Sequence, residues 1–360
     1  MIGDNEVRWR SRKLIHFSGC DYFRLARHPA VAAAARVTLE KAGLNVAASR
    51  LTTGNRQLYA ELEKEVAAFF GTETSLLLPD GYLAPLAAAQ TLAGAFSHAF
   101  MDELSHAALI DAARMLDCRV QTFRHRDPTD LARKLAKLPR HARALVVTDG
   151  MFAHDGSAAP LSEYHKLLPA SGMILVDDAH GAGVLGASGR GTPEHEGVNR
   201  RRIIQCGTLS KAFGAYGGIL LITRAQRKQI VARSRLFAGS TPLPPPLAGA
   251  ALAALKLLKR EPIRRERLLR NVTYLREHLR RAGWDLAQTP GPIVRLPLMK
   301  SAVANELKKR LLAAGIYPPF LKYGKASAAG FFRFVISSEH TKQQLDKLAR
   351  VLAALKARRG

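Results

Sequence analysis

Lys211 stands in a setting that suits a lysine for covalent chemistry. It lies in the segment GTLSKAFGAYGG (207–218), among small residues and glycines, directly after the apolar run 203–206. Small neighbours let a flat ring approach the backbone, and the hydroxyls of Thr208 and Ser210 can bond a phosphate or the lysine itself. Partial desolvation favours the neutral amine, which can form a Schiff base with a carbonyl compound. A glycine-rich turn with a solvated lysine is the alternative that this segment by itself leaves open.

A second segment, MILVDDAHGAG (173–183), carries carboxylates at the end of an apolar run. Asp177 and Asp178 close the run, and His180 follows three residues after the first of them. This pattern predicts a buried parallel strand that delivers side chains at its carboxyl end, where ligands bind in open α/β sheets. A carboxylate held there can pair with a protonated pyridinium nitrogen, as the chemistry of pyridoxal phosphate (PLP) requires.

Together the two segments resemble fold-type I PLP enzymes, and TLSKAFGAYGG and VDDAHGAGVLG resemble the α-oxoamine synthase family in particular. DELSHAALIDAAR (102–114) adds a third similar motif, and the resemblance extends over nearly the whole chain. It implies an α/β fold with a large domain, built on a mostly parallel sheet of seven strands between helices, and a smaller C-terminal α+β domain. The expected division is an N-terminal arm and helix over 1–45, the PLP-binding domain over 46–245, and the C-terminal domain over 246–360.

The resemblance also implies roles for individual residues. Lys211 would carry the cofactor and move the substrate's α-proton, and Asp177 would keep the ring nitrogen protonated. His106 would stack on the ring, and His180 would support its phenolate oxygen. Further contacts to the cofactor are expected from Gly81, Tyr82, Thr208 and Ser210 of one subunit and from Ser240 and Thr241 of its neighbour, and Arg333 is expected to bind the amino acid's α-carboxylate.

The chain departs from the family pattern at several positions. Arg24 replaces a glycine, Tyr59 replaces a histidine, and Ala153 replaces a serine that contacts the cofactor's phenolic oxygen. The segment around Tyr317 and Phe320 lacks the arginine and the threonine found in synthases of the biotin pathway. The end of the site that binds the acyl chain is therefore expected to differ. The proline-rich segment 235–246, which contains Ser240 and Thr241, is expected to be extended and to link the two larger domains.

Composition narrows the class of protein. At 360 residues, 47% of them hydrophobic, the chain can bury large cores, and two subdomains are expected. No apolar run reaches the roughly 18 residues that span a bilayer, and the polar start lacks the apolar core of a secretory signal. The three cysteines are far apart and lack CxxC spacing. They are interpreted as reduced thiols of a cytoplasmic protein, with no metal site and no disulfide framework.

The formal net charge of +26 raises the question of an anionic partner. Bases are most frequent over 256–281, where leucines and a valine recur at helical spacing and aromatic residues are few. A solvated, arginine-rich helix face explains this pattern best. Attraction of an anionic substrate such as coenzyme A or an acyl carrier protein comes second, and nucleic acid is a distant third.

The predicted reaction is the condensation of a small α-amino acid with an acyl thioester of coenzyme A or of a carrier protein, with loss of CO2 and thiol, to give an α-amino ketone. A homodimer with shared active sites is expected. Another fold-type I PLP activity, such as an aminotransferase or an aldolase, is the alternative. A basic binding protein without catalysis belongs to a different class, and the presence of Lys211, Asp177 and His106 argues against it.

Overall fold

The computed structural model describes residues 5–322 and 330–357. Two compact units make up the chain. The large unit comprises His28–Phe152 and Ala158–Arg260, and the small unit comprises Met1–Arg27, Ala153–Ser157 and Glu261–Gly360. The domain boundaries expected from the sequence, at 45/46 and 245/246, stay predictions.

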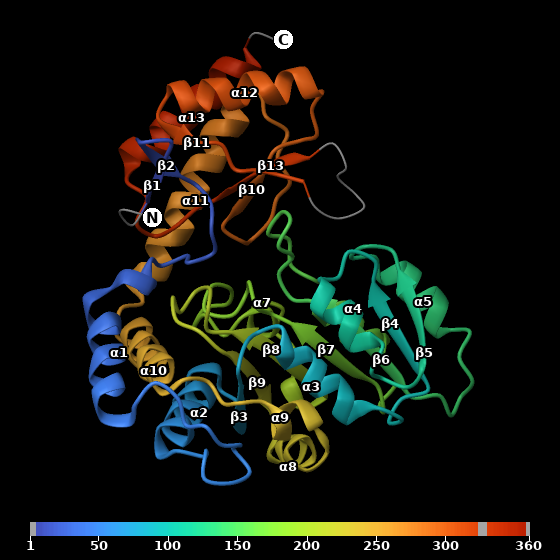
Figure 1. Cartoon of the computed structure of the whole chain (residues 1–360). Coiled ribbons are helices and arrows are strands. Elements are labelled where there is room, and N and C mark those ends of the chain that lie inside the picture. Colours follow the sequence, from blue (N-terminus) through green and yellow to red (C-terminus); the bar gives the residue numbers. More distant parts are fainter. Residues whose placement is uncertain (1–4, 323–329, 358–360) are drawn as a thin grey trace. The chain divides into compact units, whose positions relative to one another are not determined.

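A seven-stranded sheet forms the centre of the large unit (Figure 1). Its strand order is β3-β9-β8-β7-β6-β4-β5, in which β8, β7, β6, β4 and β5 run parallel and β9 is antiparallel to both of its neighbours. The predicted sheet of seven mostly parallel strands is thereby confirmed. Its strands are β3 (Thr74–Leu78), β4 (His98–Asp102), β5 (Arg119–Phe123), β6 (Ala144–Asp149), β7 (Met173–Asp177), β8 (Ile203–Thr208) and β9 (Gly218–Ile222).

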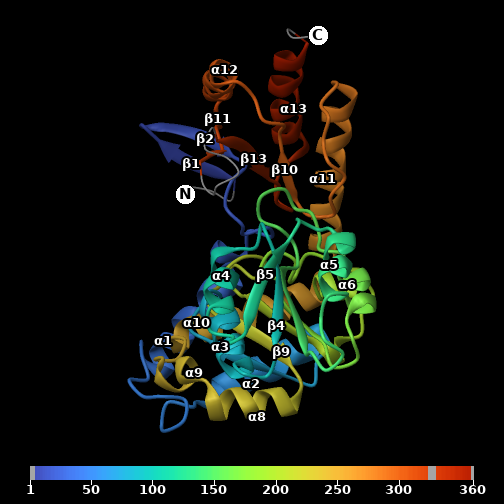
Figure 2. The ribbon, with the colours of Figure 1, turned by 90° about the vertical axis from the view of Figure 1, so that its right-hand side faces the viewer.

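Helices cover both faces of this sheet because its central strands are apolar on both sides. Alternate side chains of β6, such as Leu145 and Val146, enter two separate hydrophobic cores. Figure 2 shows α3 and α4 on one side of β4 and β5, with α5 and α6 on the other. The helices of the large unit are α1 (Pro29–Ala42), α2 (Gln57–Phe70), α3 (Leu83–Leu92), α4 (Ala107–Ala113), α5 (Pro128–Leu135), α6 (Leu161–Leu167), α7 (Thr192–His195), α8 (Arg224–Arg233), α9 (Arg235–Gly239) and α10 (Pro245–Arg260).

The segment 235–246 differs from its prediction as an extended link. Residues Arg235–Gly239 form the helix α9, and α10 begins at Pro245, so that extended backbone is confined to the few residues between them. Ser234 explains the start of α9, because its side chain accepts a hydrogen bond from the backbone N–H of Phe237. The prolines fit the first turn of α10, where a missing N–H costs nothing.

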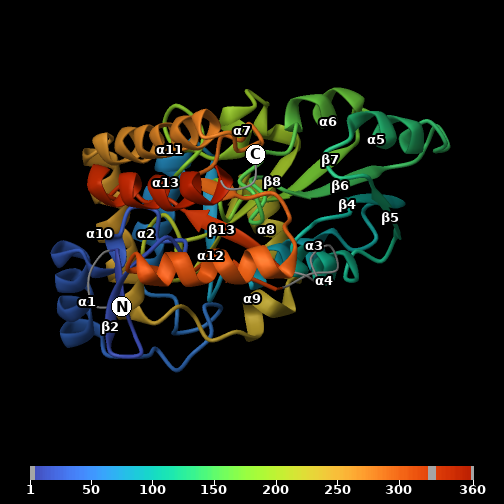
Figure 3. The ribbon, with the colours of Figure 1, turned by 90° about the horizontal axis from the view of Figure 1, so that it is seen from above.

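The small unit contains two three-stranded sheets. One has the order β1-β2-β11, from β1 (Glu6–Trp9), β2 (Arg12–His16) and β11 (Ile316–Tyr317); the other has the order β10-β13-β12, from β10 (Ile293–Arg295), β12 (Phe320–Leu321) and β13 (Phe331–Val335). Its helices are α11 (Ile263–Arg281), α12 (Ser301–Ala313) and α13 (Lys342–Lys356). Figure 3 shows α11 and α13 side by side. The leucines predicted to share one helix face, Leu268, Leu275 and Leu279, are buried on α11.

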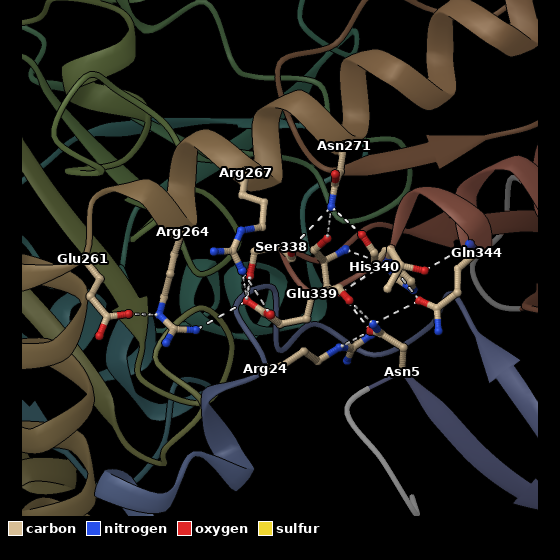
Figure 4. A network of polar contacts seen from close by, with 12 residues as sticks. Asn5, Arg24, Glu261, Arg264, Arg267, Asn271, Ser338, Glu339, His340 and Gln344 are labelled. Atoms are coloured by element: carbon tan, nitrogen blue, oxygen red, sulfur yellow. Dashed lines mark hydrogen bonds and ion pairs between the residues drawn. The ribbon is translucent and has the colours of Figure 1, made fainter.

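Polar contacts tie the N-terminal arm to the C-terminal part of the small unit (Figure 4). The Asn5 side chain donates to the carbonyl of Glu339 at 2.5 Å, and its Oδ1 accepts from Arg24 Nε at 3.0 Å. Arg264 and Arg267 form ion pairs with the Glu339 carboxylate. The arm from Asn5 onward is therefore part of the small unit's fold. Within the described ranges, no helix combines the length and the apolar character needed to cross a membrane.

Candidate active site

A cavity of about 350 Å³ opens in the large unit, beyond the carboxyl ends of β6, β7 and β8. Strands that run parallel end at the same sheet edge, which brings side chains from distant parts of the sequence together there. The cavity is lined by Asp80, Gly81, Tyr82, His106, Ala108, Asp149, Asp177, Ala179, His180, Thr208, Ser210 and Lys211. Eight of the eleven residues that the sequence singled out thus share one cavity.

Lys211 lies in the tight connection between β8 and its antiparallel neighbour β9. The Leu209 N–H donates to the carbonyl of Gly217 at 2.8 Å, and the Gly214 N–H donates to the carbonyl of Lys211 at 3.0 Å. Gly214 and Gly217 have φ angles of 57° and 120°, which favour glycine. The glycines around Lys211 therefore close a turn that presents its side chain to the cavity.

Asp177 ends β7 and is 5% exposed. It lies between Asp149 of β6 and Cys206 of β8 in the sheet register. Its Oδ1 accepts a hydrogen bond from the Ala179 N–H at 3.1 Å, which orients the carboxylate within the cavity wall. A buried carboxylate in this place can pair with a cationic ring nitrogen.

His106 begins α4, where its Nδ1 accepts a hydrogen bond from the Ala108 N–H at 3.2 Å. Its side chain lines the cavity and is only partly shielded from solvent. This partial burial lowers the pKa of His106, and the charge of Lys211 lowers it further against the opposing effect of Asp177. Partial burial and Lys211 therefore both favour the neutral form of the imidazole.

The floor of the cavity near α3 has no room for a side chain. A Cβ atom added at Gly81 would lie 2.7 Å from the Cβ of Thr208, and one at Gly218 would lie 2.0 Å from the carbonyl oxygen of Asp80. The Thr208 hydroxyl donates to the carbonyl of Gly217 at 3.0 Å and accepts from the Ser210 N–H at 3.1 Å. Thr208 thus shapes the lysine turn, and its hydroxyl hydrogen is engaged there.

Three predicted residues do not line this cavity. Ser240 borders a smaller cavity near Arg50, and Thr241 is exposed. Arg333 belongs to the small unit, in the centre of β13, where its Nη2 lies 3.3 Å from the Sγ atom of Cys20. Sequence reasoning missed Cys20 as its neighbour, because the two residues are 313 positions apart.

Asp149 is the cavity residue that sequence reasoning missed. It ends β6, and its Oδ2 accepts a hydrogen bond from the His106 N–H at 2.8 Å. Burial raises the pKa of Asp149 well above its usual range, and the charge of nearby Asp177 adds to the rise. The ionised form of Asp149 is therefore disfavoured beside Asp177. The signal was present in the sequence, because the apolar run 144–149 ends in a carboxylate as the run 173–177 does.

The lining residues fit PLP. The cavity offers an amine for the cofactor's aldehyde at Lys211, a buried carboxylate for its ring nitrogen at Asp177, and an imidazole for its ring face at His106. Gly81 and Tyr82, which precede α3, line the cavity, where their amides and the Ser210 hydroxyl can hold a phosphate. Within the described part of the chain, no group of His, Cys, Asp and Glu side chains is arranged to hold a metal ion.

Known proteins resemble this chain over almost its full length. A family model described as aminotransferase class I and II matches residues 12–352. The 8-amino-7-oxononanoate synthase of Methylococcus capsulatus is 38% identical over 346 residues, which cover 94% of this chain and 88% of that protein. Its counterpart from Thioalkalivibrio sulfidiphilus is 37% identical over 348 residues, which cover 95% and 88%. The chain belongs to the α-oxoamine synthase family.

Solved structures support the same assignment. A serine palmitoyltransferase variant from S. paucimobilis with bound PLP and myriocin is 28% identical, with a TM-score of 0.92, and the match covers 99% of this chain and 91% of that one. This α-oxoamine synthase is therefore a PLP-dependent acyltransferase with the fold-type I architecture. Both the predicted family and the predicted cofactor are confirmed.

Proposed function

We propose that the enzyme condenses a small α-amino acid with an acyl thioester, with loss of CO2 and of the thiol, and that the cavity around Lys211 is where this happens. The observation that carries the proposal is the convergence of Lys211, Asp177 and His106 on one cavity in a chain of the α-oxoamine synthase family. When bound, PLP supplies an electron sink for the carbanion that forms at the amino acid's α-carbon.

Four side chains of the cavity have proposed roles in the reaction. Lys211 would hold the cofactor through its Nζ atom and would then accept the substrate's α-proton. Asp177 would pair with the ring nitrogen, and its burial would strengthen that interaction. His106 would orient the ring by stacking, and partial burial favours its neutral form. His180, 7% exposed in the cavity wall, would support the ring's phenolic oxygen.

Arg333 is proposed to bind the α-carboxylate of the amino acid. Its neighbours along β13 are buried and apolar, and a guanidinium in such surroundings favours an anionic partner. A charge-assisted bidentate contact between an arginine and a carboxylate contributes roughly 1.5–3 kcal/mol. Arg333→Lys should therefore weaken amino-acid binding about ten- to hundredfold while PLP loading stays normal.

Arg295→Lys is the matched control for this variant. Arg295 faces Arg333 across the β10–β13 pair, and its guanidinium stacks 4.6 Å from the ring centre of Phe331. We expect the control to bind the amino acid normally. If Arg333→Lys and Arg295→Lys weaken amino-acid binding equally, the effect is not specific to Arg333, and Arg333 does not bind the α-carboxylate.

A homodimer with shared active sites completes the proposal. Ser240 and Thr241 lie outside the cavity of their own subunit, as they must if they reach the cofactor of a neighbour. Tyr82, Leu104 and Tyr216 expose between 39% and 44% of their surface in segments that also carry cavity residues. Exposed apolar side chains beside a site are typical of surfaces that a partner covers.

A cytoplasmic location is proposed because the three cysteines are free thiols, which a reducing compartment maintains.

The test supplies carboxyl-labelled amino acids with coenzyme A thioesters of increasing chain length and with the matching carrier-protein thioesters. Labelled CO2 and free thiol should appear together, in equal amounts. An aminotransferase would give a different result, because it consumes a 2-oxo acid and releases no thiol from any thioester. That result would replace the proposed reaction with amino transfer at the same site.

A further inference from the structure

Asp178 is the second carboxylate of the VDDAH segment, and it does not line the cavity. Asp178 follows the last residue of β7, and its carboxylate contacts Thr192 and Gln205, whereas Asp177 lines the cavity. Its side chain is 0% exposed. Burial raises the pKa of Asp178 to about 7, which shows how strongly its surroundings disfavour a lone charge. A carboxylate in such a place needs specific partners.

Three hydrogen bonds supply those partners. Thr192 donates its N–H to Oδ2 of Asp178 at 2.8 Å and its hydroxyl to Oδ1 at 2.6 Å. The Gln205 side-chain amide donates to Oδ2 at 2.7 Å, and its oxygen accepts from the Arg200 guanidinium. Asp178 therefore joins the end of β7 to the start of α7 and to the middle of β8.

The backbone around this carboxylate leaves no free space. A Cβ atom added at Gly150 or at Gly181 would lie 2.2 Å from Oδ1 of Asp178, and one at Gly191 would lie 1.9 Å from Oδ2. Gly150 follows β6, whereas Gly181 and Gly191 both lie in the connection between β7 and α7. Backbone from two connections thus approaches one carboxylate at three points, and a side chain at any of them would displace it.

The segment that Asp178 closes carries cavity residues. Ala179 and His180 line the cavity and lie between Asp178 and Thr192. Further bonds hold the segment in a compact form: the Gly183 N–H donates to the carbonyl of Gly189 at 2.9 Å, and the Gly191 N–H donates to the carbonyl of Leu185 at 2.9 Å. The Ala179 N–H in turn orients the Asp177 carboxylate. A change at Asp178 is thereby transmitted to Asp177 and His180.

We propose that Asp178 is a positioning residue of this enzyme: its buried carboxylate clamps residues 178–192 through Thr192 and Gln205 and so holds Asp177 and His180 in place against the bound cofactor. The inference deepens the proposed function and rests on it for the identity of the reaction. Misplacing a reacting group by about 1 Å can cost a hundredfold in rate. Loss of the clamp should therefore lower kcat and leave amino-acid binding nearly unchanged.

The experiment compares Asp178→Ala, Asp178→Asn and Asp130→Ala in the full-length, PLP-loaded enzyme. Asp178→Asn keeps an acceptor for the Thr192 N–H and for Gln205, and its amide can donate to the Thr192 hydroxyl, which can also accept. Asp130 is the matched control, a 3% exposed carboxylate of the large unit that accepts the Arg124 N–H and does not line the cavity. Thr192→Val, which removes one bond of the clamp, serves if Asp178→Ala does not fold.

We expect kcat to fall about ten- to hundredfold in Asp178→Ala, with KM for the amino acid changed less than about threefold, and to stay within about threefold of wild type in Asp178→Asn. Hydrogen exchange should accelerate over 179–191 in Asp178→Ala and not in Asp130→Ala, which should keep wild-type kcat. Thr192→Val should show a smaller loss of kcat and the same exchange pattern.

A folded Asp178→Ala or Thr192→Val enzyme with wild-type kcat and unchanged exchange overturns the clamp, as does an equal loss of kcat in Asp130→Ala. Hydrogen exchange requires no acyl donor. If no thioester is consumed, the proposed reaction fails, while the exchange of 179–191 still tests the clamp.

Discussion

Acid should destabilise the small unit through His340, which is buried as a neutral imidazole. Its side chain is 3% exposed, and its ring stacks on Phe17 with the ring centres 4.3 Å apart. Nδ1 accepts a hydrogen bond from the Ser337 N–H at 2.9 Å, and Nε2 lies 3.1 Å from the carbonyl of His16, to which it donates. Figure 4 shows the ring among the polar contacts of this region. A proton added at Nδ1 would point at the N–H of Ser337.

The size of the effect follows from the pKa. Burial, with the charge of Arg24 adding to it, lowers the pKa of His340 to about 3. Because this pKa is below that of an unfolded histidine, about 6.5, the unfolded state binds the proton more strongly. The contribution to stability is fully present above about pH 6.5 and is lost as the pH falls toward 3. At about 1.4 kcal/mol per pH unit, roughly 3 kcal/mol should be lost between pH 6.5 and 4.5.

Tryptophan fluorescence can measure this loss in the small unit alone, because the chain's two tryptophans, Trp9 and Trp284, both belong to it. Urea unfolding would be compared at about pH 7 and pH 4.5 for wild type and His340→Gln. The glutamine amide can still donate to the carbonyl of His16, and it does not titrate. We expect the variant to be less stable at pH 7 by about 1–2 kcal/mol, since the Ser337 N–H loses its acceptor, and to lose less stability on acidification.

Other titrating groups contribute equally to the pH dependence of unfolding in wild type and in His340→Gln, so their contributions cancel when the two proteins are compared. If wild type and His340→Gln lose the same free energy of unfolding between the two pH values, His340 is not a neutral, buried group, and the reasoning from its geometry is wrong.

Three further outcomes are expected. Borohydride reduction of the PLP-loaded enzyme, followed by peptide mapping, should place the pyridoxyl group on Lys211; a label on another lysine removes this assignment. Asp177→Ala should still bind PLP but exchange the amino acid's α-proton orders of magnitude more slowly, because a buried charge-assisted bond is lost, and near-normal exchange would exclude the role. Mixing Lys211→Ala with a Ser240→Ala/Thr241→Ala protein should restore part of the activity in heterodimers, whereas an active monomer in sedimentation would rule out shared sites.

Local sequence patterns predicted much of the large unit. The apolar run before Asp177 agrees with β7, and the glycine-rich segment around Lys211 is the connection between β8 and β9. The two buried strands that end in carboxylates are β6 and β7. The prediction of an extended segment over 235–239 was wrong. The helix there depends on the N-cap by Ser234, and the neighbouring prolines do not indicate such a cap.

Contacts between distant residues could not be predicted. The pairing of β2 with β11 and the bond from Asn5 to Glu339 join the two ends of the chain, and no periodicity reports such neighbours. The same holds for Cys20 beside Arg333. Each of these depends on how the small unit's sheets assemble, which is decided by packing over the whole unit.

The sequence by itself indicated that the lysine turn and the strand ending at Asp177 belong to one site, because strand patterns and glycine content are local properties. It also showed that two carboxylates, Asp177 and Asp178, follow the same apolar run. Only the tertiary structure decided which of them enters the cavity. That choice depends on Thr192 and Gln205, which are 14 and 27 residues from Asp178 and meet its carboxylate where neighbouring segments pack together.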